Sequence, residues 1–214
     1  MPSHPKTLLV EGRTDQKVIP YLMEENGVTW PEPPNSPVFI KPYGGVDEIL
    51  RPGVMEAELR ASGLEALGVV VDADEDLAGR WDRLKAWCSS EFEELPDQVP
   101  AEGLRVVHSD GPRFGIWIMP DNRLAGMLED LLVGLIPDDS RELYELARRC
   151  TRESRRQGAT YKTVHERKAQ LHAWLAWQDP PGLRLHDAVK GPVLDPTRPE
   201  SRPFVGWFRG LFGV

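Results

Sequence analysis

The stretch Gly68-Val69-Val70-Val71-Asp72-Ala73-Asp74-Glu75-Asp76 decides the fold class of this 214-residue chain. An apolar run of this kind, rich in β-branched residues and bounded by polar ones, is typical of a buried strand in a parallel sheet. The acids then lie at the carboxyl end of the strand, where open α/β sheets build their ligand sites. Residues two apart in an extended chain point to the same side. We therefore expect Asp72 and Asp74 to present two carboxylates together, as a cation site requires.

A second acid follows an earlier strand. Residues 7–11, Thr-Leu-Leu-Val-Glu, predict an apolar strand that ends in Glu11, 61 residues before Asp72. If the two strands are neighbours in a parallel sheet, Glu11, Asp72 and Asp74 meet at the same edge. Three close carboxylates stay ionised together only when a cation compensates their charge. Oxygen ligands favour Mg²⁺ or Mn²⁺ over zinc, so the sequence predicts one of these two ions.

The first helix is expected directly after Glu11. Gly12 permits a tight turn without steric cost. Thr14 can cap the helix, and Asp15 lies in its first turn, where an acid is favoured. Asp15 is therefore expected to add an outer or second-site ligand to the cation. Pro20 predicts a kink or an early end of this helix.

Strands and helices alternate up to Ile136, which predicts an α/β fold with a mostly parallel central sheet flanked by helices. Two later strands, at 105–107 and 114–119, are joined at Asp110–Arg113 and predict an antiparallel hairpin. After Pro137 only helices are expected, over 140–157 and 164–178. We therefore predict an α/β domain over residues 1–136 and a C-terminal helical extension over 137–214, packed together as one structural unit.

Composition narrows the classes of protein. The net charge of −8 argues against a protein that coats nucleic acid generally. The two cysteines, Cys88 and Cys150, lie in no CxxC pair, so a disulfide framework or structural zinc is not expected. No signal peptide is visible and no apolar run is long enough to span a membrane. A reduced, cytoplasmic protein without a membrane partner is the expectation.

A basic stripe stands out against the acidic total. Between residues 148 and 168 eight cationic side chains face only two acidic ones. The first five recur at helical spacing on one face, so they predict a surface that follows phosphates, although a solvated face paired with the chain's own acids is the competing interpretation. The expected DNA or RNA contacts are Arg148, Arg149, Arg152, Arg155, Arg156 and Lys162.

Aromatic residues gather at the C-terminus. Phe204, Trp207, Phe208, Leu211 and Phe212 recur at helical spacing and must be covered by something. Docking on the chain's own sheet is the first expectation, and a homodimer or partner interface is the second. A similar pattern in residues 171–177 predicts that both Trp174 and Trp177 lie on a buried helix face.

Two segments together resemble a known fold family. Residues 8–15, Leu-Leu-Val-Glu-Gly-Arg-Thr-Asp, followed by residues 69–74, Val-Val-Val-Asp-Ala-Asp, are similar to a TOPRIM domain, whose signature is a Glu after the first strand and a DxD after a later one. This match covers roughly residues 6–120. The whole chain further resembles small stand-alone TOPRIM-like proteins related to the OLD nucleases, through residues 119–122, 128–132 and 168–177.

The resemblance implies a Rossmannoid TOPRIM-like fold and metal-dependent phosphodiester chemistry. Glu11 falls on the position of the general acid or base, and Lys168 on that of a catalytic lysine, with Lys162 as the other candidate. The positions of the metal ligands fall on Asp72 and Asp74, with further ligands at Asp121 and Glu129. OLD-like systems couple such domains to ATPases, so an ATPase partner protein is implied.

Other interpretations remain open at the level of the sequence. A non-catalytic nucleic-acid-binding or regulatory subunit would keep the fold and the basic stripe. A phosphatase with Asp72 as nucleophile lacks a recognisable downstream acid pair. Asp76 is either a ligand or a helix cap. Glu75 points to the opposite side in an extended chain and is expected to be dispensable.

Overall fold

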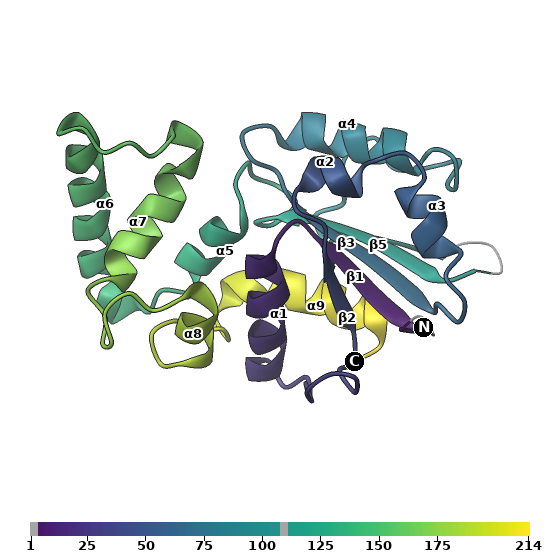
Figure 1. The fold of residues 1–214 in the computed structure, drawn as a ribbon, viewed down its shortest axis with the longest axis horizontal. Coiled ribbons are helices and arrows are strands. Elements are labelled where there is room, and N and C mark those ends of the chain that lie inside the picture. The colour runs from purple at the N-terminus through teal and green to yellow at the C-terminus, as the bar shows by residue number, and fades with distance from the viewer. Residues whose placement is uncertain (1–3, 108–110) are drawn as a thin grey trace.

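A computed structural model describes residues 4–107 and 111–214 (Figure 1). Five strands form one sheet in the order β2-β1-β3-β5-β4. All neighbouring pairs are parallel except β4 and β5, which are antiparallel. The strands are β1 (Lys6–Val10), β2 (Phe39–Pro42), β3 (Ala66–Asp72), β4 (Leu104–Val107) and β5 (Arg113–Met119). The expected mostly parallel sheet with an antiparallel pair is confirmed, while Asp110 of the expected hairpin turn lies outside the described residues.

Helices cover both faces of the sheet (Figure 1). The α-helices of the described residues are α1 (Arg13–Glu25), α2 (Val46–Ile49), α3 (Val54–Leu59), α4 (Leu77–Cys88), α5 (Leu128–Gly134), α6 (Arg141–Arg156), α7 (Glu166–Leu175), α8 (Leu185–Lys190) and α9 (Arg202–Phe212). Short 3₁₀ turns η1 (Asp138–Ser140), η2 (Thr163–His165) and η3 (Pro199–Ser201) precede α6, α7 and α9. One apolar core joins the sheet to α1 and α9, and a second joins its other face to α2, α3 and α4.

Strand β3 is the middle strand of the sheet, and both of its faces are covered. Every residue from Ala66 to Val71 is buried, so the apolar run carries no alternation of polar and apolar residues. Val10 of β1 lies opposite Val70 of β3 in a parallel register. The two strands therefore end at the same edge, which brings Glu11 within one residue of Asp72 in the register.

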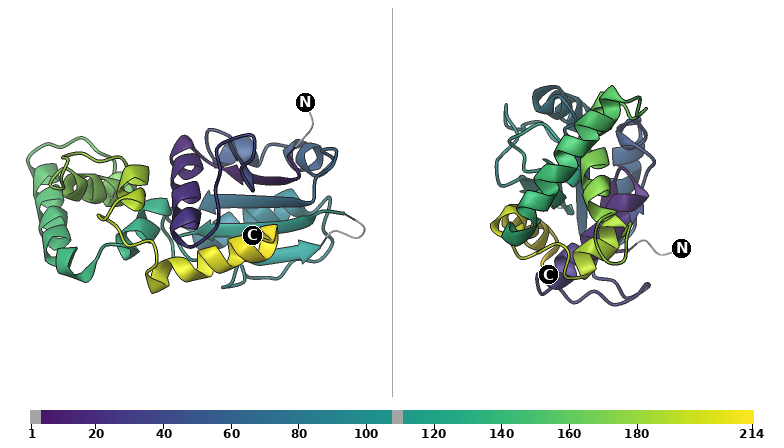
Figure 2. Two further views of the ribbon diagram at one scale, coloured as in Figure 1. Left: turned by 90° about the horizontal axis from the view of Figure 1, so that it is seen from below. Right: turned by 90° about the vertical axis from the view of Figure 1, so that its left-hand side faces the viewer.

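The C-terminal helix α9 packs beneath the sheet (Figure 2). All five of its predicted stripe residues are buried, so the expected docking on the chain's own sheet is confirmed. The approach is close because two strand residues facing α9 are glycines. A Cβ at Gly68 would lie 2.8 Å from the Phe212 ring, and one at Gly115 would lie 2.8 Å from Leu211.

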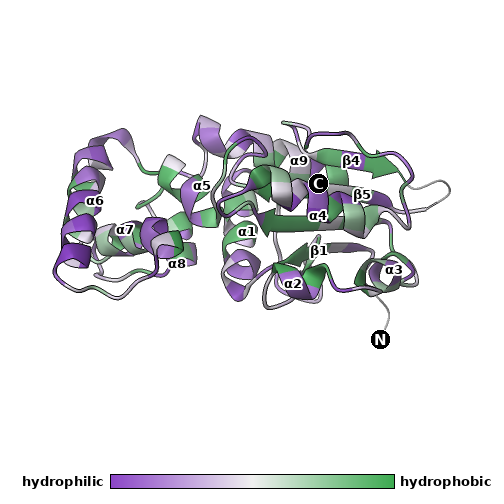
Figure 3. Cartoon of the chain, turned by 90° about the horizontal axis from the view of Figure 1, so that it is seen from above, coloured by the Kyte–Doolittle hydropathy of each residue, from purple (hydrophilic) through white to green (hydrophobic). Residues whose placement is uncertain are grey.

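A lobe made of α6, α7 and α8 projects from the carboxyl edge of the sheet (Figures 1 and 2). Hydrophilic residues dominate the outer face of α6, whereas the strands are hydrophobic (Figure 3). Helix α5 contacts α7 and so connects the lobe to the sheet. The residues after Pro137 are therefore divided, since α6–α8 form the lobe while α9 belongs to the layer under the sheet.

An early end of the first helix at Pro20 and burial of Trp177 were both expected, and the structure shows neither. Helix α1 continues through Pro20 to Glu25, with Val18 and Leu22 fully buried on either side of the proline. Trp174 is buried as expected, but Trp177 is 44% exposed because α7 ends at Leu175.

Candidate functional site

Two acids meet where β1 and β3 end. The Oε1 atom of Glu11 accepts a hydrogen bond from the backbone N–H of Asp72, at 2.9 Å. Asp72 in turn accepts a hydrogen bond through Oδ1 from the backbone N–H of Leu128, at 3.0 Å. Leu128 is the first residue of α5, so this carboxylate sits at a helix N-terminus, where negative charge is favoured. The expected meeting of Glu11 and Asp72 at one edge is confirmed.

Asp15 and Glu129 add two more carboxylates. Asp15 is 9% exposed and accepts a hydrogen bond from the backbone N–H of Gly12, at 3.0 Å. Glu129, on α5, is 4% exposed. The ammonium of Lys168, on α7, lies 3.1 Å from Oε1 of Glu129 and closes the site from the helical lobe. The contact of Asp15 with Gly12 and that of Glu129 with Lys168 each use one carboxylate oxygen. The other oxygen of each side chain takes no part in these two contacts.

Burial and neighbouring charges raise the pKa of three of these acids, Asp72, Asp15 and Glu11. Burial raises the pKa of Asp72 well above its usual range, and the negative charges of Asp15, Glu11 and Glu129 raise it further. Burial, followed by Glu11 and Glu129, raises the pKa of Asp15 to about 6. Burial also raises the pKa of Glu11. The cluster thus holds more negative charge than its own surroundings compensate, which is the electrostatic state that a divalent cation relieves.

Asp74 does not present its carboxylate beside that of Asp72 in the way an extended chain would. The backbone of Asp74 has a φ of 53°, in the left-handed region, and its N–H donates to the carbonyl of Gly126 at 2.9 Å. Its Oδ2 atom lies 2.6 Å from Nη2 of Arg80, on α4. We expected Asp72 and Asp74 to point to the same side because residues two apart do so in an extended chain. That expectation was wrong, since the strand ends at Asp72 and the backbone of Asp74 is left-handed. Within residues 4–107 and 111–214, no three His, Cys, Asp or Glu side chains are placed to hold a metal ion in their present rotamers.

Two other acids have structural roles. Asp121 accepts hydrogen bonds through Oδ1 from the backbone N–H groups of Arg123 and Leu124, at 3.0 and 2.9 Å. These bonds close a turn, so the structure gives no support to Asp121 as a metal ligand. Asp76 caps α4 by accepting from the N–H of Gly79 at 2.9 Å, which decides between the two interpretations left open for it.

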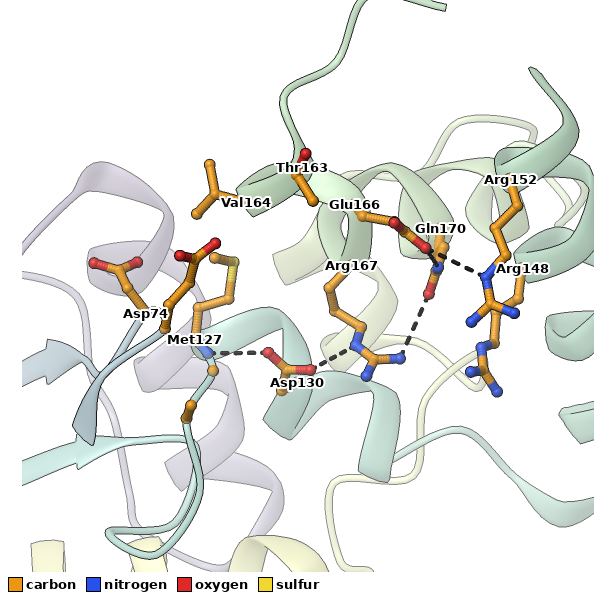
Figure 4. Close-up of a pocket in the computed structure, with 13 residues that line it drawn as sticks. Asp74, Met127, Asp130, Arg148, Arg152, Thr163, Val164, Glu166, Arg167 and Gln170 are labelled. Carbon is orange, nitrogen blue, oxygen red and sulfur yellow. Dashed lines mark hydrogen bonds and ion pairs between the residues drawn. The ribbon is translucent and has the colours of Figure 1, made fainter. Parts of the chain in front are cut away.

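A cleft of about 420 Å³ lies between the sheet edge and the helical lobe (Figure 4). Asp74 and Glu75 line one side. Arg148 and Arg152 of α6 line the other, together with Arg167 of α7. A connected row of side chains runs along the cleft, with contacts between Asp130 and Arg167 at 2.5 Å, Arg167 and Gln170 at 3.4 Å, Gln170 and Glu166 at 2.8 Å, and Glu166 and Arg152 at 3.4 Å (Figure 4).

The members of the basic stripe therefore lie in different environments. Of the six residues expected to contact DNA or RNA, Arg148 and Arg152 line the cleft, and Arg167 of the same stripe lines it with them. Arg155 donates to Thr163 at 2.6 Å, and Arg156 pairs with Glu153 at 3.0 Å. Arg149 and Lys162 are exposed.

Sequence reasoning missed two arginines. Arg167 was counted in the stripe but not assigned to the site, because its approach to Asp130 depends on the packing of α7 against α5. Arg80 follows Asp74 by six residues on an amphipathic helix, and nothing in the sequence pattern separates it from a solvated helix arginine.

Fold and site together define an α/β protein with a cluster of half-buried and buried carboxylates at the edge where two parallel strands end, and an arginine-lined helical lobe beside it. The chain belongs to the family described as "Protein of unknown function (DUF3226)", which matches residues 5–213. Neither the search of curated proteins nor that of solved structures found a match. In the parts of the chain that the structure describes, no helix has the length and apolar character needed to cross a membrane.

Proposed function

We propose that this protein is a Mg²⁺-dependent nuclease of the TOPRIM type, or a related phosphodiester-processing enzyme, that acts on DNA or RNA. The observation that carries the proposal is the gathering of Glu11, Asp15, Asp72 and Glu129 at one edge of the parallel sheet, with Lys168 beside them. Glu11 and Asp15 are four residues apart, but Asp72, Glu129 and Lys168 come from three other parts of the sequence. Gathering four acids, two of them buried and two half-buried, costs free energy, which a functional role explains.

The donor set fits Mg²⁺ or Mn²⁺, because every candidate ligand is a carboxylate oxygen. Asp72, Asp15 and Glu129 are the residues whose carboxylates would hold the ion. Divalent ions bound there supply positive charge to the attacking and leaving oxygens of a phosphodiester.

The chain's own residues would complete the reaction. Glu11 would take the proton of the attacking water, because burial raises the pKa of its carboxyl and so makes it a better base. Lys168 would neutralise charge that develops on the phosphate, since its side chain is 46% exposed while its ammonium already reaches the acids.

The helical lobe would supply a binding surface for the DNA or RNA strand. Arg148 and Arg152 line the cleft at the end away from Asp74, so they would hold phosphates that flank the reacting one (Figure 4). We further propose a cytoplasmic location, because Cys88 and Cys150 are both free thiols. An ATPase partner, which the family resemblance implies, belongs to the same proposal.

A non-catalytic nucleic-acid-binding or regulatory subunit is the second candidate. The observation in its favour is the ion pair between Asp74 and Arg80, which neutralises one of the two acids of the DxD. A chain that has given up metal binding would retain such a pair without cost to function.

The two candidates separate in a metal titration followed by a cleavage assay. We expect Mg²⁺ or Mn²⁺ to bind the unsubstituted chain in calorimetry and to support cleavage of single-stranded DNA, plasmid DNA or RNA that EDTA stops. Asp72→Asn and Glu11→Gln should each lower the rate at least about a hundredfold. Asp121→Asn is the matched control and should cleave normally, because its carboxylate only closes a turn. Absence of divalent binding by the unsubstituted chain would favour the non-catalytic subunit.

A further inference from the structure

Arg80 is a buried cation whose hydrogen bonding is incomplete. Its side chain is 8% exposed and lies in the first turn of α4. Nη2 binds Asp74 at 2.6 Å. Nε and Nη1 are buried, and no acceptor among the described residues is within hydrogen-bonding distance of either. A guanidinium has five N–H donors in a rigid plane, so several of them are left without a partner here.

The surroundings of Arg80 are acidic but do not use these donors. Asp74 follows β3, Glu11 follows β1 and Asp47 lies on α2, and the charge of Arg80 acts on Glu11 and Asp47 as well. Asp47 is bound instead to Arg83, at 2.6 Å. An unpaired buried N–H is costly, and the cost is greater for a charged group. A purely structural arginine would be expected to have its donors satisfied.

An open cavity of about 630 Å³ lies beside this guanidinium. Asp74, Glu75, Arg80 and Arg83 line it, and Val164 closes it from the helical lobe. Asp74 and Glu75 also line the cleft between the sheet and the lobe, so the two cavities share a wall. A nucleic-acid strand bound in the cleft would therefore pass the carboxylate of Asp74, which is paired with Arg80 in the free protein.

We propose that Arg80 binds a phosphate group of a nucleic-acid strand, and that the carboxylate of Asp74 occupies the place of that phosphate in the free protein. A phosphate offers the same anionic oxygens as a carboxylate and matches the planar fork of a guanidinium in two parallel hydrogen bonds. Rotation of the Arg80 side chain toward the cavity exchanges one acceptor for the other. Asp74 is then released toward the remaining acids. This inference rests on the proposed function, which it extends by a substrate-binding residue.

The test measures binding rather than cleavage. Anisotropy of a fluorescein-labelled single-stranded oligonucleotide gives its affinity in EDTA and in Ca²⁺, with a gel to show that the strand is intact. Arg80→Gln should weaken binding about tenfold or more, the loss expected for a charge-assisted hydrogen bond. Arg80→Lys should recover only part of it, because the charge returns without the fork. Lys85→Gln, on the same helix, is the matched control and should change affinity less than about threefold, because Lys85 pairs with Asp82 at 3.1 Å and lines neither cavity.

A second variant covers the case in which Arg80→Gln does not fold. Asp74→Asn removes the competing anion, so in EDTA it should bind the oligonucleotide more tightly than the unsubstituted chain does. Equal or weaker binding by Asp74→Asn, or unchanged affinity in a folded Arg80→Gln, overturns the role of Arg80 and leaves the proposed function standing. If the unsubstituted chain binds no oligonucleotide in either buffer, the proposed function itself fails, and this inference fails with it.

Discussion

Asp15 is buried beside other carboxylates, and this makes the stability of the metal-free protein depend on pH. Its pKa rises from 3.8 to about 6 on folding, so the folded state binds more protons than the unfolded state between these values. Stability is therefore expected to fall as pH rises through this window, with the full penalty present above pH 6. The shift corresponds to about 3 kcal/mol. Urea unfolding in EDTA at pH 4 to 7 measures the free energy of unfolding, which should vary less with pH in Asp15→Asn than in the unsubstituted chain. Identical pH profiles for the two would contradict this role of Asp15.

Asp72 is subject to the same repulsion at a helix N-terminus. Asp72→Asn keeps an acceptor for the N–H of Leu128 and removes one negative charge from the cluster. We expect it to raise the thermal midpoint in EDTA by at least about 3 °C, since 1 kcal/mol is worth roughly 2–4 °C at this size. It should also lose the further rise that Mg²⁺ gives the unsubstituted chain. A lower midpoint in EDTA would show that the carboxylate is compensated within the fold.

The side chains of the site differ in how far the sequence could place them. Glu11 and Asp72 could be paired in advance, because both end strands of a parallel sheet and the register brings those ends together. Asp74 could not, since its direction depends on a left-handed backbone and a bond to Gly126. The unpaired donors of Arg80 are a property of packing alone, and no pattern of residues displays them.

Apolar patterns in the sequence predicted which segments form helices and strands. Where those elements end is decided by tertiary contacts. Helix α7 stops at Leu175, so the helical period no longer holds at Trp177 and that side chain is exposed. Pro20 removes one backbone donor from α1, yet the helix persists because its apolar face is buried against the sheet and α8. Local propensity was overridden in this helix by burial.

The contact between α9 and the sheet offers a matched pair of glycine substitutions. A Cβ at Gly115 would lie 2.8 Å from Leu211 and 3.0 Å from the carbonyl oxygen of Leu104, so Gly115→Ala should destabilise the fold by about 1–2 kcal/mol. Gly206 lies on the exposed side of α9, and the Cβ that an alanine would add there has no neighbour within 4 Å. Gly206→Ala should therefore stabilise by about 0.5–1 kcal/mol. Chemical denaturation measures both, and the same sign for the two would contradict this packing of α9.

At the scale of the whole molecule, charge is separated between the two parts of the chain. The total is −8, yet the α6–α7 region carries the arginine stripe. Helical spacing was sufficient to predict the stripe, but not which of its members face the acids, because that depends on how α6 and α7 pack beside α5. Arg148 and Arg152 gain this role from their position on α6 rather than from any local motif.

This division of the stripe predicts how binding responds to salt. Each phosphate neutralised by a cationic side chain releases counterions, and the slope of log K against log[salt] falls by about 0.7 per contact for a single strand. Replacing both Arg148 and Arg152 by Gln should make this negative slope shallower by about 1.4 and should weaken binding of every oligonucleotide sequence similarly. The matched control is Arg156→Gln, since Arg156 lies on the same helix, pairs with Glu153 and does not line the cleft. An equal loss of slope per charge in the control would show that the whole stripe acts as a diffuse surface and that the cleft does not direct the strand.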